Sequence, residues 1–312
     1  MHPAVAHCLQ ASTAMPATAT LAQWLPAWRQ RVATGADPMA LALHGGFAAD
    51  RMAWAFAAGY QAALRRLLPG SGPDEVLALC LTESTGNRPR DLRCLATQQP
   101  DGGWLLQGEK SWSTFGTAAT SLLVVAVQGG EGAEPGGHPR LLAMRVSPGT
   151  PGVAVHGQAP TSLVPELPHA KLGLNGARLP AEARLPGDGF SDYGKPFRTL
   201  EDQYVNAAIL AWLLREARAR GWPEGLRERL AATLAALAAV ADAPPDAAAT
   251  HVALAGALAW ARELCAEVQP LWATTPDDPA SQRWMRDAKL LGVASTARAA
   301  RAARAWERLS GA

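Results

Sequence analysis

The stretch DGGWLLQGEKSWSTFG, residues 101–116, lies in the first half of the chain and has the pattern of a strand that follows a tight turn. Asp101-Gly102-Gly103 is a turn signal, and Trp104-Leu105-Leu106 begins an apolar run directly after it. A Gly-containing turn before an apolar run is typical of a β-hairpin. We therefore expect a hairpin with its turn at residues 101–103.

Short apolar runs continue on both sides of this hairpin. Val76 to Leu81 precede it, and Thr120 to Val127, Leu141 to Val146 and Val153 to His156 follow it. The run from Thr120 is rich in Leu and β-branched residues, which suits a strand buried on both faces. The Gly-rich segment 128–139 is expected to be a loop. Several short strands at this spacing predict a β-sandwich or barrel over residues 75–190.

Helical periodicity replaces the strand pattern outside these limits. Apolar residues of Met52–Leu68 recur on one helical stripe, which a Pro- and Gly-rich segment ends at residues 69–73. Further helices are expected near 199–220, 225–241, 246–268 and 279–309. The expected fold class is α+β multidomain, with a short N-terminal helical domain (1–74), a central β-domain (75–190) and a C-terminal helical bundle (191–312).

Composition and charge exclude several classes of protein. Hydrophobic residues make up 48% of the 312 residues and charged residues 18%, which is a globular balance. The net charge of +2 lacks the excess of basic residues that is typical of proteins that bind nucleic acid or an anionic membrane. No run reaches the about 18 apolar residues of a membrane helix, and the N-terminus lacks a signal-peptide pattern. The four Cys and seven His have no metal-ligand or redox spacing, so we expect no metal and a cytoplasmic protein.

Four segments, taken together, resemble the acyl-CoA dehydrogenase family. Leu79–Glu83 (LCLTE) followed by residues 101–116 is similar to the family's T-E-P strand and its D-G-x-(W/Y)-x-L-x-G-x-K-x-W-I-(T/S)-N-G run. Leu185–Phe190 (LPGDGF) is similar to the family's exit from the β-domain, and Arg286–Lys289 (RDAK) to the opening of its last helix. Another family segment is matched only at its ends, by Gly59 and Leu68-Pro69. The family's Pro, Ile and Asn are replaced here by Ser84, Ser113 and Phe115.

The resemblance implies an FAD cofactor and gives five residues a place beside it. Trp112 would lie against the flavin ring, and Thr114 would offer its hydroxyl or main-chain N–H to flavin N5. Thr82, with Leu81, would bond the pyrimidine edge of the ring, and Ser113 is counted among the cofactor contacts. A buried polar ring needs its few heteroatoms paired, which these residue types permit. The alternative is that Trp112 is ordinary core and both threonines are plain strand residues.

The family's reaction also needs a base that removes the substrate α-proton while hydride leaves the β-carbon. Most members carry this glutamate in the last helix, where Ser295 stands here, and an unactivated hydroxyl is no base at neutral pH. A minority place it in the first helix of the bundle, where Glu201 matches. Independently, Glu201 shares a helical face with Val205, Ala208 and Trp212, so partial burial would raise its pKa toward that of a general base.

Several residues have a structural interpretation instead. Thr199 could be a helix N-cap, with Glu201 and Asp202 as first-turn acids that favour the helix dipole. His169 could be a substrate contact, but it is expected to be a structural loop residue, and His251 and Trp260 are expected to pack in the bundle. One face of the last helix carries four arginines that are expected to be solvated or to lie between subunits: Arg298, Arg301, Arg304 and Arg308.

The departures from the family pattern keep a second function open. Residues 84–90 stand where the family has a Gly/Ser-rich loop at the FAD pyrophosphate, and Arg88 or Arg90 would have to substitute by charge. The family's R-x-x-F-G and Q-x-x-G-G-x-G segments are absent from the sequence. The resemblance implies α,β-dehydrogenation of an acyl-CoA or other acyl thioester, electron-transfer flavoprotein as a partner, and a homo- or mixed oligomer. The alternatives are a non-catalytic homologue that partners a relative, and a monooxygenase of the same fold.

Overall fold

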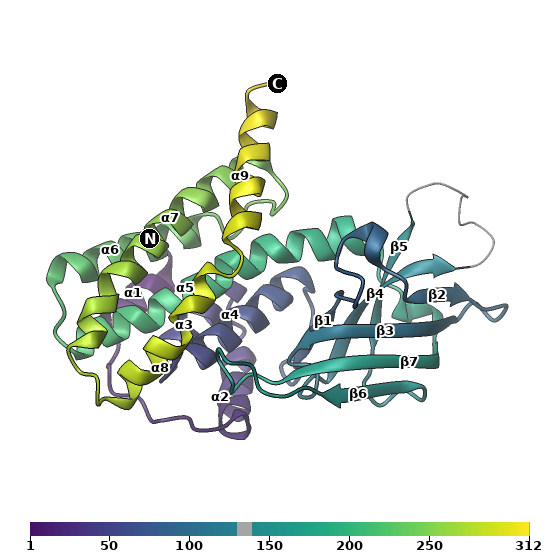
Figure 1. Ribbon diagram of the computed structural model, residues 1–312, viewed down its shortest axis with the longest axis horizontal. Helices are drawn as coiled ribbons and strands as arrows, with labels where there is room; N and C mark the ends of the chain where they lie inside the picture. Colours follow the sequence, from purple (N-terminus) through teal and green to yellow (C-terminus); the bar gives the residue numbers. More distant parts are fainter. Residues whose placement is uncertain (130–138, 312) are drawn as a thin grey trace. The chain divides into compact units, whose positions relative to one another are not determined.

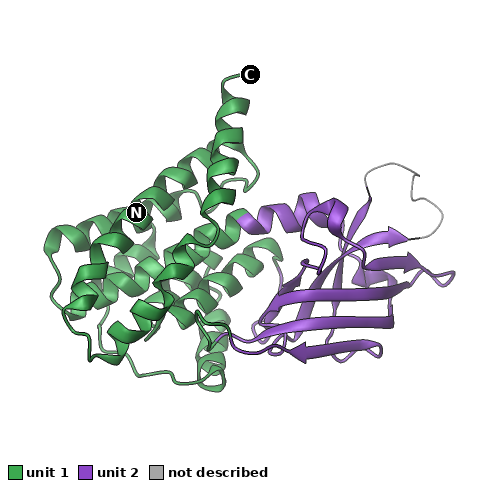
Figure 2. Cartoon of the chain, viewed as in Figure 1, with its two compact units in different colours: residues 1–69, 161–166, 199–312 green, residues 70–160, 167–198 purple. Residues whose placement is uncertain are grey.

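The computed structural model describes residues 1–129 and 139–311 (Figure 1). Most of the segment for which we predicted a loop, 128–139, lies outside the described residues. The chain divides into two compact units (Figure 2). The helical unit comprises residues 1–69, 161–166 and 199–312, and the sheet unit comprises residues 70–160 and 167–198. The helices that precede the sheet in the sequence therefore share one unit with those that follow it.

Helices form where the sequence predicted them, with one exception. The predicted fold class, helices on either side of a central β-segment, is confirmed. The first four helices are α1 (Pro3–Gln10), α2 (Leu21–Ala33), α3 (Pro38–Phe47) and α4 (Met52–Leu67). The later helices are α5 (Lys195–Ala219), α6 (Glu224–Ala239), α7 (Ala248–Ala273), α8 (Pro279–Asp287) and α9 (Ser295–Leu309). Among the described residues, no helix has the length and apolar character needed to cross a membrane.

The exception is the predicted helix at 279–309, which is two helices. A 3₁₀ segment, Ala288–Gly292, separates α8 from α9. Arg286 and Asp287 therefore end α8 and do not open the last helix, as the family resemblance had suggested. Their side chains explain the break, because Asp287 is fully buried and accepts a hydrogen bond from Val164 N at 2.9 Å. Arg286 pairs with Glu166 as well as with Asp287, so both residues are fixed on segment 161–166 of the same unit.

The strands of the sheet unit form one hydrogen-bonded sheet of seven strands. Their bounds are β1 (Leu77–Cys80), β2 (Leu95–Gln98), β3 (Trp104–Thr114), β4 (Ser121–Gly129), β5 (Leu141–Val146), β6 (Val153–Gly157) and β7 (His169–Leu179). The order is β1-β4-β2-β3-β7-β6, with β5 on β4. The predicted hairpin is confirmed, because β2 and β3 pair antiparallel with Gln98 opposite Trp104. Strand β4 is buried along most of its length, as its composition predicted.

Close helix packing explains two glycines of the helical unit. A Cβ added to Gly59 of α4 would lie 2.5 Å from the Val205 Cα of α5. A Cβ added to Gly46 of α3 would lie 2.1 Å from the Ala208 carbonyl oxygen. Since real Cβ contacts are not this short, α3 and α4 approach the α5 main chain only because these residues lack a side chain. The close approach of α4 to α5 therefore explains why a glycine stands at position 59, where the sequence resembles the family.

The start of α5 decides one of the alternatives left open by the sequence. A π-helical turn, Gly189–Gly194, precedes α5, and the Asp188 side chain caps it by accepting from Phe190 N and Ser191 N. The helix then begins at Lys195, a full turn before Thr199. Thr199 is buried inside α5, so the hypothesis that it is an N-cap, with Glu201 and Asp202 in the first turn, is wrong.

Candidate functional site

An irregularity in β3 turns the Trp112 side chain outward. Lys110 pairs with Leu172 of β7 but Ser113 pairs with Ala170, so β3 has one extra residue between these two pairs. Such a bulge breaks the alternation of side chains along a strand. Lys110 and Ser113 consequently both face the interior, whereas the intervening Trp112 is 39% exposed. Thr114 is half-buried, so the outward side of this strand end carries one large ring and one hydroxyl.

The end of β1 lies directly beside this strand end. Thr82 forms an isolated antiparallel bridge with Trp112, and its carbonyl accepts from Ser111 N at 2.9 Å. The Leu81 side chain is buried with Leu92, Val125 and Leu141, and its carbonyl accepts from the buried Lys110 Nζ at 3.4 Å. The sheet therefore brings together all five predicted cofactor residues, which we call the site corner: Leu81, Thr82, Trp112, Ser113 and Thr114.

The Ser113 hydroxyl is directed away from the outer face of the site corner. Its Oγ lies 3.2 Å from Cys80 Sγ and donates to the Leu79 carbonyl at 3.2 Å. Burial raises the pKa of the Cys80 thiol to about 11, so this pair is neutral at physiological pH. Only the main chain of Ser113 could therefore contact a ligand on the outer face.

A buried ion pair, which sequence reasoning missed, lies behind the site corner. Lys110 is fully buried and donates from Nζ to Glu83 Oε1 at 2.6 Å and to the Leu81 carbonyl at 3.4 Å. Glu83 also accepts from Arg93 N at 2.7 Å and from Cys94 N at 3.1 Å. One carboxylate thus connects the end of β1, the start of β2 and the middle of β3. The sequence offered little signal for this pair, because Lys110 is flanked by the polar Glu109 and Ser111.

His169 forms the second support of Trp112. It begins β7 opposite Thr114, so the prediction of a loop histidine is wrong. Its imidazole stacks on the indole of Trp112 with ring centroids 4.3 Å apart and planes inclined by 29°. His169 is only 8% exposed, and burial lowers its pKa, so the ring is neutral at pH 7. One face of Trp112 is covered by this ring, and the exposed part of the indole belongs to its other face and edges.

The loop that follows Glu83 has most of its polar groups bonded internally. Asp91 Oδ2 accepts from Arg88 N at 3.1 Å, and Thr85 Oγ1 donates to the Asp91 carbonyl at 2.5 Å. Gly86 exchanges two main-chain hydrogen bonds with Glu83. A Cβ on Gly86 would lie 2.4 Å from the Asp91 carboxylate, so this carboxylate fills the concave side of the turn. These main-chain donors do not fit a pyrophosphate, and only the exposed Arg88 and Arg90 side chains could meet one by charge.

Glu201 belongs to the helical unit and is not part of the site corner. It is half-buried on α5, and the neighbouring Asp202 is buried. Asp202 pairs with Arg298, at 2.8 Å, and with Arg301, both on α9. The prediction of a solvated arginine face is therefore wrong for these two, although Arg304 and Arg308 are exposed. Ser295 is the first residue of α9.

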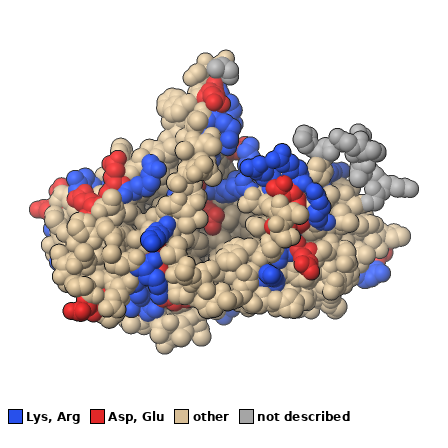
Figure 3. Space-filling view, viewed as in Figure 1, with Lys and Arg blue, Asp and Glu red and all other residues tan. Residues whose placement is uncertain are grey.

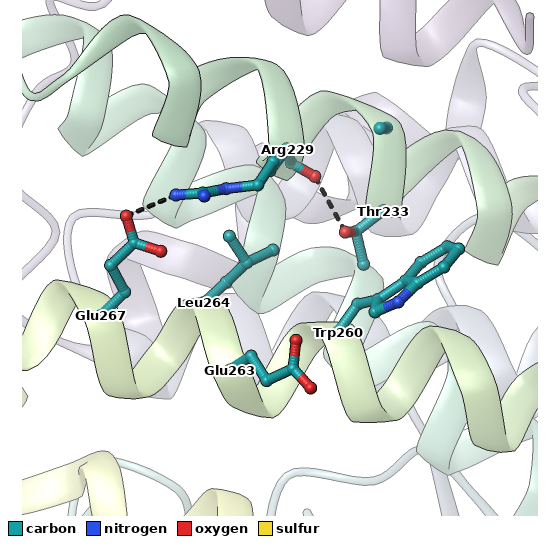
Figure 4. Close-up of a pocket in the computed structure, with 7 residues that line it drawn as sticks. Arg229, Thr233, Trp260, Glu263, Leu264 and Glu267 are labelled. Carbon is teal, nitrogen blue, oxygen red and sulfur yellow. Dashed lines mark hydrogen bonds and ion pairs between the residues drawn. The ribbon is translucent and has the colours of Figure 1, made fainter.

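A groove of about 370 Å³ between α6 and α7 has none of the predicted site residues in its lining (Figure 4). Trp260 is 53% exposed, so the prediction that it packs in the bundle is wrong. His251, in contrast, is buried as predicted. Arg229 and Glu267 form an ion pair across the groove, and Thr233 donates to the Arg229 carbonyl. The groove therefore offers one indole, the Arg229–Glu267 ion pair and the Glu263 carboxylate.

On the face seen in Figure 3, blue and red side chains lie interspersed, in keeping with the net charge of +2. Within the part of the chain that the structure describes, no three His, Cys, Asp or Glu residues gather in a metal-binding group. The four cysteines are free thiols, all buried.

Comparison with known proteins finds a partial sequence match and a shared fold. No protein-family profile matches the chain. Benzylmalonyl-CoA dehydrogenase from Aromatoleum aromaticum is 30% identical over 156 residues, which is 49% of this chain and 39% of that protein. The chain therefore matches about two fifths of the length of this relative.

Two solved structures share the fold over most of their length. A structure described as an FAD-dependent dehydrogenase superposes with a TM-score of 0.69 and 14% identity, over 99% of this chain and 98% of the other. Butyryl-CoA dehydrogenase from Megasphaera elsdenii superposes with a TM-score of 0.58 and 17% identity, over 86% of this chain and 81% of the other. At these identities, the likeness concerns the fold.

Proposed function

Because this chain is an acyl-CoA dehydrogenase-like protein by its fold, we propose that it is a flavin-dependent oxidoreductase that introduces an α,β double bond into an acyl thioester. The observation that carries the proposal is the site corner. A half-exposed indole lies there beside the half-buried Thr82 and Thr114, on a rigid strand end. A large aromatic face with a few polar groups at its edge is the chemistry that a flavin ring requires.

The residues of the site corner fit the ring portion of the cofactor, FAD in our proposal. Trp112 would supply the apolar face, Thr114 a hydroxyl or N–H near N5, and Leu81 with Thr82 the polar edge. A bound flavin would supply the acceptor for the hydride that leaves the substrate β-carbon. The loop offers fewer donors to the pyrophosphate portion, because the N–H groups of Gly86, Arg88 and Asp91 are already bonded within the loop.

Glu201 is the base in this proposal. Its carboxylate would take the substrate α-proton, so that the electron pair of that C–H bond forms the double bond as hydride departs. The neighbouring Asp202 holds Arg298 and Arg301, which commits that acid to the α5–α9 contact. Glu201, which stands at the position that the family resemblance gives to the base, is the acid we assign to chemistry.

The substrate and partners follow from the same proposal. We infer an acyl-CoA substrate, and the partial match to benzylmalonyl-CoA dehydrogenase favours including a substituted dicarboxylic acyl group among those tested. Electron-transfer flavoprotein is the proposed oxidant of the reduced cofactor. A homo- or mixed oligomer in the cytoplasm is the expected setting, and exposed Trp306 and Leu309 on α9 offer apolar contact surface.

The first experiment is the visible spectrum of the purified protein, with the flavin released by denaturation and identified. Titration with FAD and FMN follows, for the wild type and for Trp112→Ala, with Trp260→Ala as a control because that indole is exposed in the α6–α7 groove. We expect flavin binding that Trp112→Ala weakens and Trp260→Ala leaves unchanged. If Trp260→Ala weakened flavin binding and Trp112→Ala did not, the flavin would not bind at the site corner.

The reaction is tested by anaerobic mixing of the flavin-loaded protein with butyryl-CoA and benzylmalonyl-CoA, followed by flavin bleaching. Glu201→Gln should bind the substrate and bleach at least about a hundredfold more slowly, because general-base catalysis contributes about 10²–10⁴-fold. Glu228→Gln, an exposed glutamate on α6, is the matched control and should bleach at the wild-type rate. Equal bleaching rates in Glu201→Gln and wild type would remove Glu201 as the base.

A second candidate function, a non-catalytic homologue that partners a relative, is favoured by two observations. Asp91 closes the loop that would hold the pyrophosphate, and Ser295 stands where most family members have a base. A colourless protein that takes up neither FAD nor FMN, together with co-purification of a longer relative, would support this function over the enzyme.

A further inference from the structure

The stack of His169 on Trp112 concerns the face of the indole that would meet a flavin, and the inference drawn from it rests on the proposed function. Trp112 has its side chain at the surface, where an unsupported indole would populate several rotamers. His169 covers one face of the indole at a centroid distance of 4.3 Å. The remaining face is the one on which a flavin ring could lie.

The main chain around His169 is fixed on both sides. Phe115 N donates to the Pro168 carbonyl at 2.7 Å, and Gln158 N donates to the His169 carbonyl at 2.9 Å. The Gln158 side chain also donates to the Ser111 carbonyl at 2.7 Å, directly before Trp112. These three hydrogen bonds connect the end of β3, Gln158 and the start of β7, so the main chain of His169 has a defined position relative to that of Trp112.

Stacking on Trp112 is the contact that positions the imidazole ring of His169. Its Nδ1 is buried and has no hydrogen-bond partner among the described residues. A buried polar atom without a partner costs stability, which an apolar ring at this position would avoid. The ring is held by stacking against Trp112 and not by a hydrogen bond at Nδ1.

We infer that His169 is a positioning residue, which holds the Trp112 indole from beneath at a fixed tilt so that its outer face receives the flavin ring. Aromatic pairs of this kind change affinities by about two- to tenfold. His169→Ala removes the support, whereas His169→Phe keeps an aromatic ring beneath the indole. His156→Ala, an exposed histidine on β6, is the matched control.

The test has two measurements on the same four proteins. The first labels the full-length chain with 5-fluorotryptophan and assigns the Trp112 resonance with Trp112→Phe, because the chain has 11 tryptophans. In His169→Ala, the Trp112 ¹⁹F line should shift and broaden while the other lines keep their positions. His169→Phe should restore a single narrow line, and His156→Ala should leave the spectrum unchanged.

The second measurement is the FAD dissociation constant and the visible circular dichroism of the bound flavin. We expect His169→Ala to weaken FAD binding about two- to tenfold and to alter the flavin band, and His169→Phe to restore both. If wild type binds FAD and His169→Ala matches it in both measurements, or if His169→Phe is as impaired as His169→Ala, the positioning role is wrong. If wild type binds no flavin, the proposed function itself fails, and the ¹⁹F spectra still show whether His169 orders Trp112.

Discussion

Replacement of Lys110 by methionine tests what holds the site corner in place. Lys110 is fully buried and donates to Glu83 at 2.6 Å and to the Leu81 carbonyl at 3.4 Å. Methionine keeps an unbranched apolar chain but removes the cation, so the Glu83 carboxylate stays buried with the N–H groups of Arg93 and Cys94 as its donors. Removing one member of a buried ion pair costs about 3–5 kcal/mol, and we expect a loss in that range in the free energy of unfolding.

The assay is urea unfolding followed by circular dichroism, with midpoint and slope compared between variants. Lys171→Met, at an exposed lysine of β7, is the matched control and should change the unfolding free energy by less than about 0.5 kcal/mol. Glu83→Gln should cost as much as Lys110→Met, and the double variant should cost less than their sum, because residues in direct contact couple by about 0.5–3 kcal/mol. A Lys110→Met loss no larger than that of Lys171→Met would refute the ion pair as the support of this corner.

Three further predictions concern stability. Gly59→Ala should destabilise the protein by about 1–3 kcal/mol, because its Cβ would meet the α5 main chain, whereas Gly225→Ala at the open start of α6 should be neutral or stabilising in the same thermal scans. Asp202→Asn should weaken the contacts of Arg298 and Arg301 and increase hydrogen exchange along α9, and unchanged protection there would contradict the pairing. Burial lowers the pKa values of His44 and His169, so the unfolded chain binds more protons and stability should fall as the pH drops from about 6.5 through the folded values, with a smaller fall in His169→Phe.

The sequence predicted the elements whose formation is decided locally. The hairpin at 101–103 follows from its turn residues, and Leu141–Val146 is a strand at the predicted bounds because its apolar residues are contiguous. Strand β7 was missed because Gly173 and Gly176 interrupt its pattern and have low strand propensity. It forms nonetheless, since β3 and β6 pair with it on both sides.

The candidate site was predictable only as a set of positions. The resemblance pointed to Thr82, Trp112 and Thr114, and the sheet brings these residues together. Their supports were not predictable, because Glu83 and Lys110 are 27 residues apart and His169 lies far from Trp112 in the sequence. The same holds for Asp202, whose partner Arg301 is 99 residues away. Pairing over such separations depends on the folded arrangement and leaves no periodic signal.

Phe115 shows how distant residues can preserve the main chain of the site corner after a change in sequence. Its φ of +65° lies in the left-handed region, where strain costs about 1–3 kcal/mol for a bulky residue. The side chain is fully buried, and burying a phenylalanine contributes about 1.5–3 kcal/mol. Because these contributions are of similar size, packing can hold a conformation that the residue itself disfavours. The Phe115 N–H donates to the Pro168 carbonyl, so this same conformation places His169 beneath Trp112. The replacement of the family's asparagine is therefore compatible with the site, since its geometry is set across strands and not by the propensity of one residue.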